Sequence, residues 1–241
     1  MQMKPFLVFA TIALWFSPFV PATVGATSRD ESLINIRHAL GIENLVNLDD
    51  GLTLTGQVEY FGTTGEYEYT FDATGRNLEH LDGPMTLTLG FDGETAWERD
   101  WNGTGRVLEL GDRDRMIMVT WLSNGLWSLE PEGLLFTSYH EEPGRVVFGV
   151  SIEHGHIDGT VTVNSKTWLP ESFKIRKEPT GTEATLADYG VFEGVQVPRF
   201  VKTIQSDGEE AVVTIRCGNP QPVQDDIFPP TCQCRRLRLR R

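Results

Sequence analysis

The sequence predicts a mainly β protein in which one long antiparallel sheet curls and two helical segments cover its concave face. Three observations point to this fold class. Apolar and polar residues alternate with a period of two in one segment after another, as in strands with one buried face. The dipeptides Asp92-Gly93 and Asn102-Gly103 favour tight hairpin turns. Apolar residues with helical spacing occur near the start and in the middle of the chain.

The clearest element is a β-hairpin at Thr86–Asn102. Thr86–Leu89 alternates polar and apolar residues, and Asp92-Gly93 accepts the positive φ angles of a tight turn. Thr95–Trp97 then resumes the strand. The stretch contains no evident catalytic group, so we expect it to supply core or cavity side chains rather than chemistry.

Alternating segments extend from Leu52 to Leu110 and from Leu134 to Cys217, and pattern matching gives about ten or eleven strands. Strands that follow one another through short turns pair antiparallel. A long sheet of this kind must curl, because strand twist accumulates along it. The curled sheet then presents a concave apolar face, which the helical segments are expected to cover.

The first helical segment begins after Ser28, where Ser28 and Glu31 have the spacing of a capping box. Apolar residues then recur at helical spacing up to Leu40, and Gly41 ends the helix. A short second turn or helix is expected at 43–48.

The other helical segment is expected at Asp112–Leu122, where apolar residues form a stripe. Asp112 or Asp114 can cap its N-terminus, and Ser123-Asn124-Gly125 ends it. The following residues, 126–133, are expected to form an irregular loop.

The first 26 residues have the pattern of a signal peptide. Lys4 supplies the positive charge, 6–16 is almost unbroken apolar sequence, and Val24-Gly25-Ala26 suits a signal peptidase. The apolar run is shorter than the roughly 20 residues that span a bilayer. We expect cleavage after Ala26 and export, either to the periplasm or by secretion, with an uncleaved membrane anchor as the alternative.

The rest of the chain is predicted to form one β domain over 27–218, followed by a Pro-rich and Arg-rich tail over 219–241 that is extended or disordered. The chain has a net charge of -13, and its C-terminal end is rich in arginine, so the body is more negative still. Such a body repels phosphate and is a poor binder of nucleic acid. The basic tail could make a peripheral contact with anionic lipid.

The cysteine content excludes a disulfide scaffold. Cys217, Cys232 and Cys234 are too few for one, so the hydrophobic core must supply the stability. In an exported protein, Cys217 could pair with either of the other two, which would leave one thiol over.

Several short motifs are spread over nearly the whole mature chain. They are Ala39-Leu40-Gly41 at a helix end, the hairpin 90–97, Trp168-Leu169-Pro170 before 172–175, Asp188-Tyr189-Gly190 before 194–198, and Asp226-Ile227-Phe228-Pro229-Pro230. In this order they resemble the periplasmic lipoprotein-carrier (LolA-like) superfamily. The resemblance implies a β half-barrel with a helical lid and an apolar cavity for acyl chains. No ligand-handling residue of that family can be placed on this sequence.

The hairpin residues 91–97 (Phe-Asp-Gly-Glu-Thr-Ala-Trp) also resemble the domain that precedes retropepsin-like aspartic proteases in some exported bacterial proteins. The Asp-Thr-Gly or Asp-Ser-Gly motif of such proteases occurs nowhere in this sequence. This departure removes protease activity from what the resemblance implies.

The sequence predicts no catalytic site. It has neither a Gly-x-Ser-x-Gly nucleophile elbow nor a phosphate-binding Gly-Lys-Ser/Thr loop. His154-Gly155-His156 with Glu153, together with His140-Glu141-Glu142, could form a metal site, because two histidines two residues apart lie on one face of a strand. Solvent-facing polar side chains near a turn are the favoured interpretation. We expect no catalytic residue, no metal and no cofactor.

The remaining functional signal is a set of apolar and aromatic side chains. Most should pack a core, and some should line a lipid-sized cavity, where flexible methionines and flat rings suit varied apolar ligands. The expected lining residues are Leu87, Leu89, Phe91, Trp97, Met116, Met118, Trp121, Phe148 and Phe173.

The leading hypothesis is an exported, monomeric, non-enzymatic protein that binds a lipid or the acyl chain of a lipoprotein. The alternative is a structural or protein-interaction domain, left from a protease-linked architecture, whose core is filled and holds no ligand. An empty apolar volume under the helices favours the first hypothesis, and a filled one favours the second.

Overall fold

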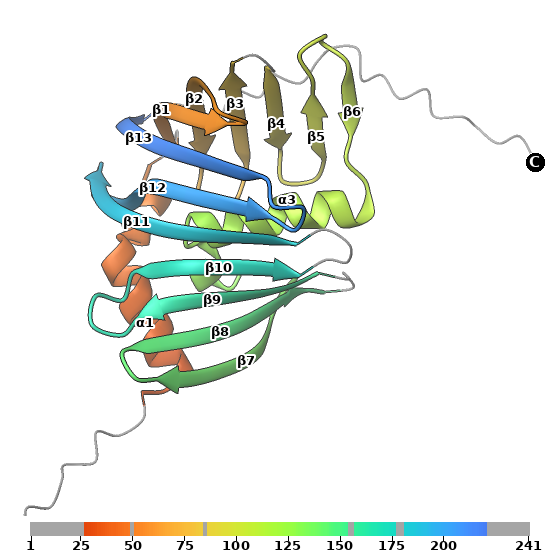
Figure 1. Cartoon of the computed structure of the whole chain (residues 1–241). Coiled ribbons are helices and arrows are strands. Elements are labelled where there is room, and N and C mark those ends of the chain that lie inside the picture. The colour runs from red at the N-terminus through yellow and green to blue at the C-terminus, as the bar shows by residue number, and fades with distance from the viewer. Residues whose placement is uncertain (1–26, 49–50, 84–85, 154–156, 177–180, 221–241) are drawn as a thin grey trace, which may run out of the picture.

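The computed structural model describes residues 27–48, 51–83, 86–153, 157–176 and 181–220. The strands in these residues form one antiparallel sheet of thirteen, in the order β6-β5-β4-β3-β2-β1-β13-β12-β11-β10-β9-β8-β7 (Figure 1). The predicted β class is therefore confirmed. The strands are β1 Leu52–Tyr60, β2 Thr63–Phe71, β3 Asn77–Asp82, β4 Leu87–Phe91, β5 Ala96–Arg99, β6 Gly105–Val107, β7 Leu134–Glu142, β8 Arg145–Ile152, β9 Asp158–Asn164, β10 Pro170–Arg176, β11 Thr182–Phe192, β12 Val195–Gln205 and β13 Glu210–Pro220.

The sheet is open, with β6 and β7 at its two edges. Strands β1 to β6 run outward in chain order on one side, and β7 to β13 return from the opposite edge. The two halves meet where β1 pairs antiparallel with β13, from Leu52 opposite Pro220 to Tyr60 opposite Ala211. The centre of the sheet therefore depends on a pairing between strands more than 150 residues apart, and the curled sheet is a half-barrel.

The thirteen strands exceed the expected ten or eleven. The difference arises from short strands, since β5 has four residues and β6 has three. Such segments hold at most two cycles of alternation, which is too little for a periodic pattern to separate them from a longer hairpin arm. At the other end, β13 includes Asn219 and Pro220, which the sequence placed in the tail.

The helices are α1 Arg29–Leu40, α2 Ile42–Val46, α3 Leu110–Ser123 and the 3-10 helix η1 Leu126–Leu129. At the start of α1, the Ser28 hydroxyl accepts a hydrogen bond from the Glu31 amide at 3.2 Å, as the capping box predicts. Gly41 ends α1 in the left-handed conformation, with a φ of 66°. No helix in the described part of the chain is long and apolar enough to cross a membrane.

Two expectations about the middle of the chain were wrong. Helix α3 begins at Leu110, and its N-cap is Glu109, without a side-chain capping bond, so Asp112 lies in the first turn and Asp114 further in. Residues 126–129, expected in a loop, form η1, where Trp127 is fully buried. The burial of Trp127 explains why this turn is ordered, because fixing an aromatic ring in the core restricts the conformations of the backbone that carries it.

One half of the concave face is filled. A row of paired residues crosses β7 to β10 there, and Trp127 packs against this region with its ring centroid 5.0 Å from that of Phe148 and 6.3 Å from that of Phe136. Buried Leu33 and Ile36 of α1 belong to the same core. The row consists of Tyr139, Phe148, Val161 and Phe173.

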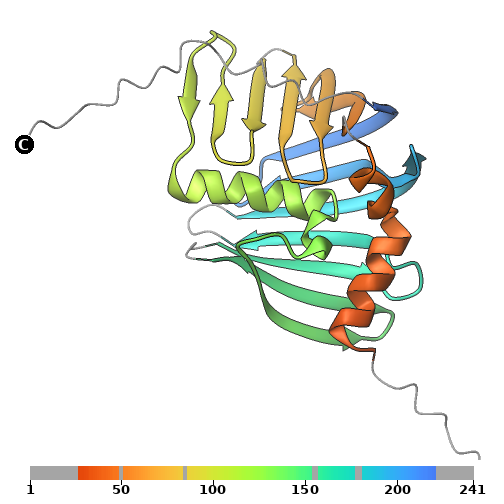
Figure 2. The same ribbon diagram turned by 180° about the vertical axis from the view of Figure 1, so that it is seen from behind.

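The other half of the concave face is formed by β1 to β6 and lies under α3. Figure 2 shows α1 and α3 on the same side of the sheet, so both helices cover the concave face. Because side chains alternate along a strand, directly paired residues share a face. The row that crosses this half consists of Leu54, Tyr69, Glu79, Leu89, Glu98 and Arg106.

The junction between α1 and α2 gives a stability prediction. Gly41 and Gly62 both have φ near 70°, where an alanine costs about 1–2 kcal/mol. A Cβ on Gly41 would also lie 2.1 Å from the Gly194 carbonyl oxygen, whereas a Cβ on Gly62 would meet no heavy atom within 4 Å. We expect Gly41→Ala to lower the free energy of unfolding by about 3 kcal/mol, roughly twice the effect of Gly62→Ala. Urea unfolding measures both, and equal losses would contradict this account.

Candidate functional site

Two adjoining hollows lie between α3 and the concave face of the sheet. The larger has a volume of about 390 Å³ and the smaller about 170 Å³. Glu79, Val119, Thr120 and Thr203 line both, so the hollows meet beside the middle of α3. We treat them as one cavity and call it the α3 cavity.

The inner wall of the α3 cavity is mostly apolar. Val119 lies at the junction, and strands from both halves of the sheet supply branched aliphatic side chains. In the larger hollow the strand residues are Leu87 and Leu89, joined by Leu108 after β6 and Met116 of α3; in the smaller they are Leu54, Val58, Leu81, Val197, Val201, Val213 and Ile215. Such a wall favours an apolar ligand, because each buried methylene contributes roughly 0.8 kcal/mol.

The outer rim of the larger hollow is polar. Arg106 of β6 pairs with Glu98 of β5, and 62 % of the Arg106 side chain is exposed, which places this ion pair at the surface. On the opposite side, the Arg115 guanidinium of α3 donates to the Thr182 hydroxyl at 2.9 Å and to the Gln205 side-chain oxygen. The cavity thus has an apolar interior and a polar, partly charged entrance.

Hydrogen bonds hold α3 at a fixed distance above the sheet. The Asn77 amide of β3 donates to the Thr120 hydroxyl at 3.1 Å, and the Asn124 amide donates to the Tyr69 hydroxyl of β2 at 2.6 Å. Together with Arg115, these contacts attach the middle and the C-terminal end of the helix to β2, β3, β11 and β12. Buried hydrogen bonds of this kind are directional, so they limit how far the helix can settle into the cavity.

Glu79 is an ionisable side chain within the apolar wall. Burial raises the pKa of its carboxyl from the ordinary 4.5 to about 7, although a hydrogen bond with Tyr67 opposes the rise. Burial also raises the pKa values of Tyr67 and Tyr69 well above 10, and the nearby Glu79 carboxyl adds to both shifts. At neutral pH Glu79 is therefore partly protonated, and both tyrosines keep their hydroxyl protons.

The structure brings three of the nine expected lining residues to the α3 cavity: Leu87, Leu89 and Met116. Five others are buried in the core cluster and line neither hollow: Phe91, Met118, Trp121, Phe148 and Phe173. Phe148 and Phe173 belong to the row in the filled half of the sheet. Whether any of these residues contacts a ligand stays a prediction.

Trp97 lies on the other face of the sheet. Phe91 pairs with Ala96, and both are buried in the concave core, so the next pair, Gly90 with Trp97, faces the convex side. The Trp97 ring covers Gly90 there, since a Cβ on Gly90 would lie 2.4 Å from ring atoms of Trp97. A side chain on Gly90 would have no room, which explains how this tryptophan is buried outside the main core.

Several lining residues were not predicted from the sequence. Val119 was seen only as part of a helical stripe, and the valines of β12 and β13 only as strand residues. Glu79 was missed although it carried a signal. It occupies an inward position on β3 between Asn77 and Leu81, where alternation calls for an apolar residue.

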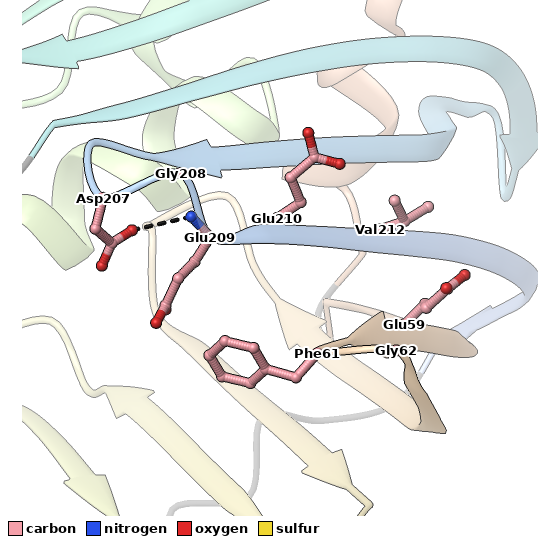
Figure 3. A pocket seen from close by; sticks show the side chains of 8 residues that line it. All are labelled: Glu59, Phe61, Gly62, Asp207, Gly208, Glu209, Glu210 and Val212. Carbon is pink, nitrogen blue, oxygen red and sulfur yellow. Dashed lines mark hydrogen bonds between the residues drawn. The ribbon is translucent and has the colours of Figure 1, made fainter.

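A third hollow, of about 480 Å³, lies between the β1–β2 turn and the β12–β13 turn (Figure 3). Four carboxylates and the exposed ring of Phe61 surround it. Glu209 accepts a hydrogen bond from Tyr60 at 2.7 Å, and Glu210 pairs with Lys202 at 2.8 Å. These partners favour a hydrated acidic surface over a binding site.

The described residues contain no group of three or more His, Cys, Asp or Glu side chains arranged to hold a metal ion. His154 and His156, the metal candidates considered from the sequence, lie outside the described residues. Cys217 is exposed on β13, and Cys232 and Cys234 also lie outside the described residues.

No family model matches the sequence, and no curated protein sequence matches it. Among solved structures, the fold is similar to that of a LolA superfamily protein from Nitrosomonas europaea, with a TM-score of 0.50 and 10% identity over 80% of this chain and 97% of that chain. A DUF1329 family protein from Desulfovibrio piger matches with a TM-score of 0.49 and 9% identity, over 80% and 94% of the two chains. The chain therefore has a LolA-like fold. The expected likeness to a domain preceding aspartic proteases stays a prediction.

The raised pKa of Glu79 predicts how stability depends on pH. Because the folded pKa of about 7 exceeds the ordinary value of 4.5, the folded state binds more protons between these pH values. The stability from this group is therefore present below pH 4.5 and is lost as the pH rises through 7. From pH 5 to pH 8 the loss is at most about 3 kcal/mol, at 1.36 kcal/mol per pKa unit.

Urea unfolding of the wild type and of Glu79→Gln at pH 5 and pH 8 measures this loss. The variant should lack it, whereas Glu68→Gln, which removes an exposed carboxylate on the adjacent strand β2, should retain it. An equal loss in the wild type and in Glu79→Gln would contradict the assignment.

Proposed function

We propose that the protein is an exported, non-enzymatic carrier or binder of lipid, and that an acyl chain occupies the α3 cavity. The observation that carries this proposal is the apolar volume left between α3 and the concave face. The larger hollow, about 390 Å³, falls within the roughly 300–1,000 Å³ of sites for small ligands. Its continuation into the smaller hollow gives an elongated chain room to extend.

The composition of the wall supports a flexible apolar ligand. Aliphatic side chains from β1, β3, β4, β12 and β13 surround the space, and Met116 adds a thioether that adapts to varied shapes. Burying each methylene of an acyl chain against this wall stabilises the complex by roughly 0.8 kcal/mol. Binding of this kind requires no chemical step, so the proposal assigns no catalytic residue, metal or cofactor.

The N-terminal sequence supports export. Residues 1–26 have the charged, apolar and small-residue regions of a signal peptide, which would direct the protein to the periplasm or beyond. The LolA-like fold accords with a lipid or acylated protein as the cargo. We further propose that the protein acts as a monomer and that its basic C-terminal end contacts anionic lipid.

One observation favours the alternative, a structural or protein-interaction domain. Around Trp127 the concave face is packed with aromatic rings, since Trp127 contacts Phe136 and Phe148, and none of these three residues lines the α3 cavity. If water alone fills the α3 cavity, this packed half suffices as the core of an interaction domain.

Blocking the junction of the two hollows tests the proposed function. Val119→Trp places a large ring where both hollows meet, and we expect at least a tenfold loss of affinity for the apolar dye N-phenyl-1-naphthylamine, followed by its fluorescence. Val191→Trp is the matched control, because Val191 is 63 % exposed and lines neither hollow. Native mass spectrometry of protein exported to the periplasm should detect co-purified lipid in the control and less in Val119→Trp. The proposal would be contradicted if both variants bound the dye with equal affinity. It would also be contradicted if the wild type neither carried lipid nor bound the dye.

A further inference from the structure

The position of Glu79 suggests that the α3 cavity recognises more than a hydrocarbon chain. Its carboxyl lines both hollows, and in the register of the sheet it lies between Tyr69 and Leu89. Among the residues that line the smaller hollow, it is the only one that can carry a full charge at neutral pH. An apolar wall that needed only to hold a chain would be more stable with an aliphatic residue at this position.

In the described part of the chain, no cationic side chain pairs with this carboxyl. The two arginines that line the larger hollow are engaged elsewhere, since Arg106 pairs with Glu98 and Arg115 binds Thr182 and Gln205. Among the described residues, Tyr67 is the hydrogen-bond partner of Glu79, and its phenol donates. A neutral carboxylic acid in this setting keeps one O–H to donate, because Tyr67 occupies only an acceptor position.

We propose that the Glu79 carboxyl is the polar contact of the α3 cavity and donates a hydrogen bond to a carbonyl oxygen of a bound acyl lipid. The inference rests on the proposed function and deepens it by naming the ligand chemistry. A carbonyl oxygen is an acceptor without a donor of its own, so it complements an O–H group. An amine would instead require the ionised carboxylate, which burial disfavours.

A ligand held in this way binds more weakly once Glu79 loses its proton. The other ionisable groups that line the cavity are Tyr67 and Tyr69 on β2, Glu98 on β5, Arg106 on β6, and Asp112 and Arg115 on α3. The pKa values of both tyrosines are raised above 10, so neither changes charge between pH 6 and pH 8.5. Glu98 is paired with Arg106 at the rim. Glu79, raised to a pKa of about 7, is the group whose proton is lost within this range.

Displacement of N-phenyl-1-naphthylamine by two lipids tests the inference. The dye has no carbonyl group and reports whether the cavity binds apolar molecules at all. Monopalmitoylglycerol supplies an ester carbonyl that does not titrate, and palmitic acid supplies a free carboxyl. We expect monopalmitoylglycerol to bind about five- to tenfold more tightly at pH 6 than at pH 8.5, the value of one hydrogen bond. Glu79→Gln, which retains an N–H donor at every pH, should bind monopalmitoylglycerol with the same affinity at pH 6 and pH 8.5. Glu68→Gln should keep the pH dependence of the wild type.

The outcomes separate the two proposals. If the affinity for monopalmitoylglycerol depends on pH in the wild type but not in Glu79→Gln, the inference is supported for ester lipids. If this pattern is found only for palmitic acid, the inference is supported for free fatty acids. If dye and lipids bind equally at both pH values, or if Glu79→Gln keeps the wild-type dependence, the inference is overturned while the proposed function stands. If neither the dye nor the lipids bind to the wild type, both are overturned.

Discussion

A curled sheet of thirteen strands has one concave face, and the burial of that face governs the rest of this structure. The two edge strands, β6 and β7, do not pair, so the sheet does not close into a barrel. Helices must therefore cover the apolar concave face and keep it from water. They do so unevenly. Trp127 and α1 fill the half formed by β7 to β10, whereas α3 covers the half formed by β1 to β6 without filling it.

The uneven filling follows from what holds α3. A helix held only by apolar contacts would settle until its side chains met the sheet, since close packing gains dispersion energy. Here Thr120 accepts a hydrogen bond from Asn77, and Asn124 donates one to Tyr69. Arg115 donates hydrogen bonds to side chains on β11 and β12. These bonds have preferred lengths, and breaking one inside the protein leaves a costly unpaired group. The polar contacts therefore favour a gap that Met116 and Val119 are too small to close.

Local patterns predicted the elements well and their assembly less well. The capping of α1 by Ser28 and its end at Gly41 follow from neighbouring residues, and the structure has both. Trp97 lies on the convex face, and its orientation could not be derived locally because it depends on the length of the turn: four residues separate Phe91 from its partner Ala96. Which part of the concave face is filled and which is open could not be predicted from the sequence, because both depend on the long-range pairing of β1 with β13.

Glu79 shows how a break in a local pattern can mark function. Strand β3 directs Asn77, Glu79 and Leu81 toward the helix, and two of these three are polar in a face that is otherwise mostly apolar. Asn77 is explained by its bond to Thr120, which holds α3. Glu79 has no comparable structural role, because its partner Tyr67 lies on the adjacent strand, already joined to β3 by the backbone. Apolar contacts hold a chain at any depth, whereas a single hydrogen-bonding group in the wall favours one position along it. A carboxyl at the junction of two hollows can therefore set how deeply an acyl chain enters.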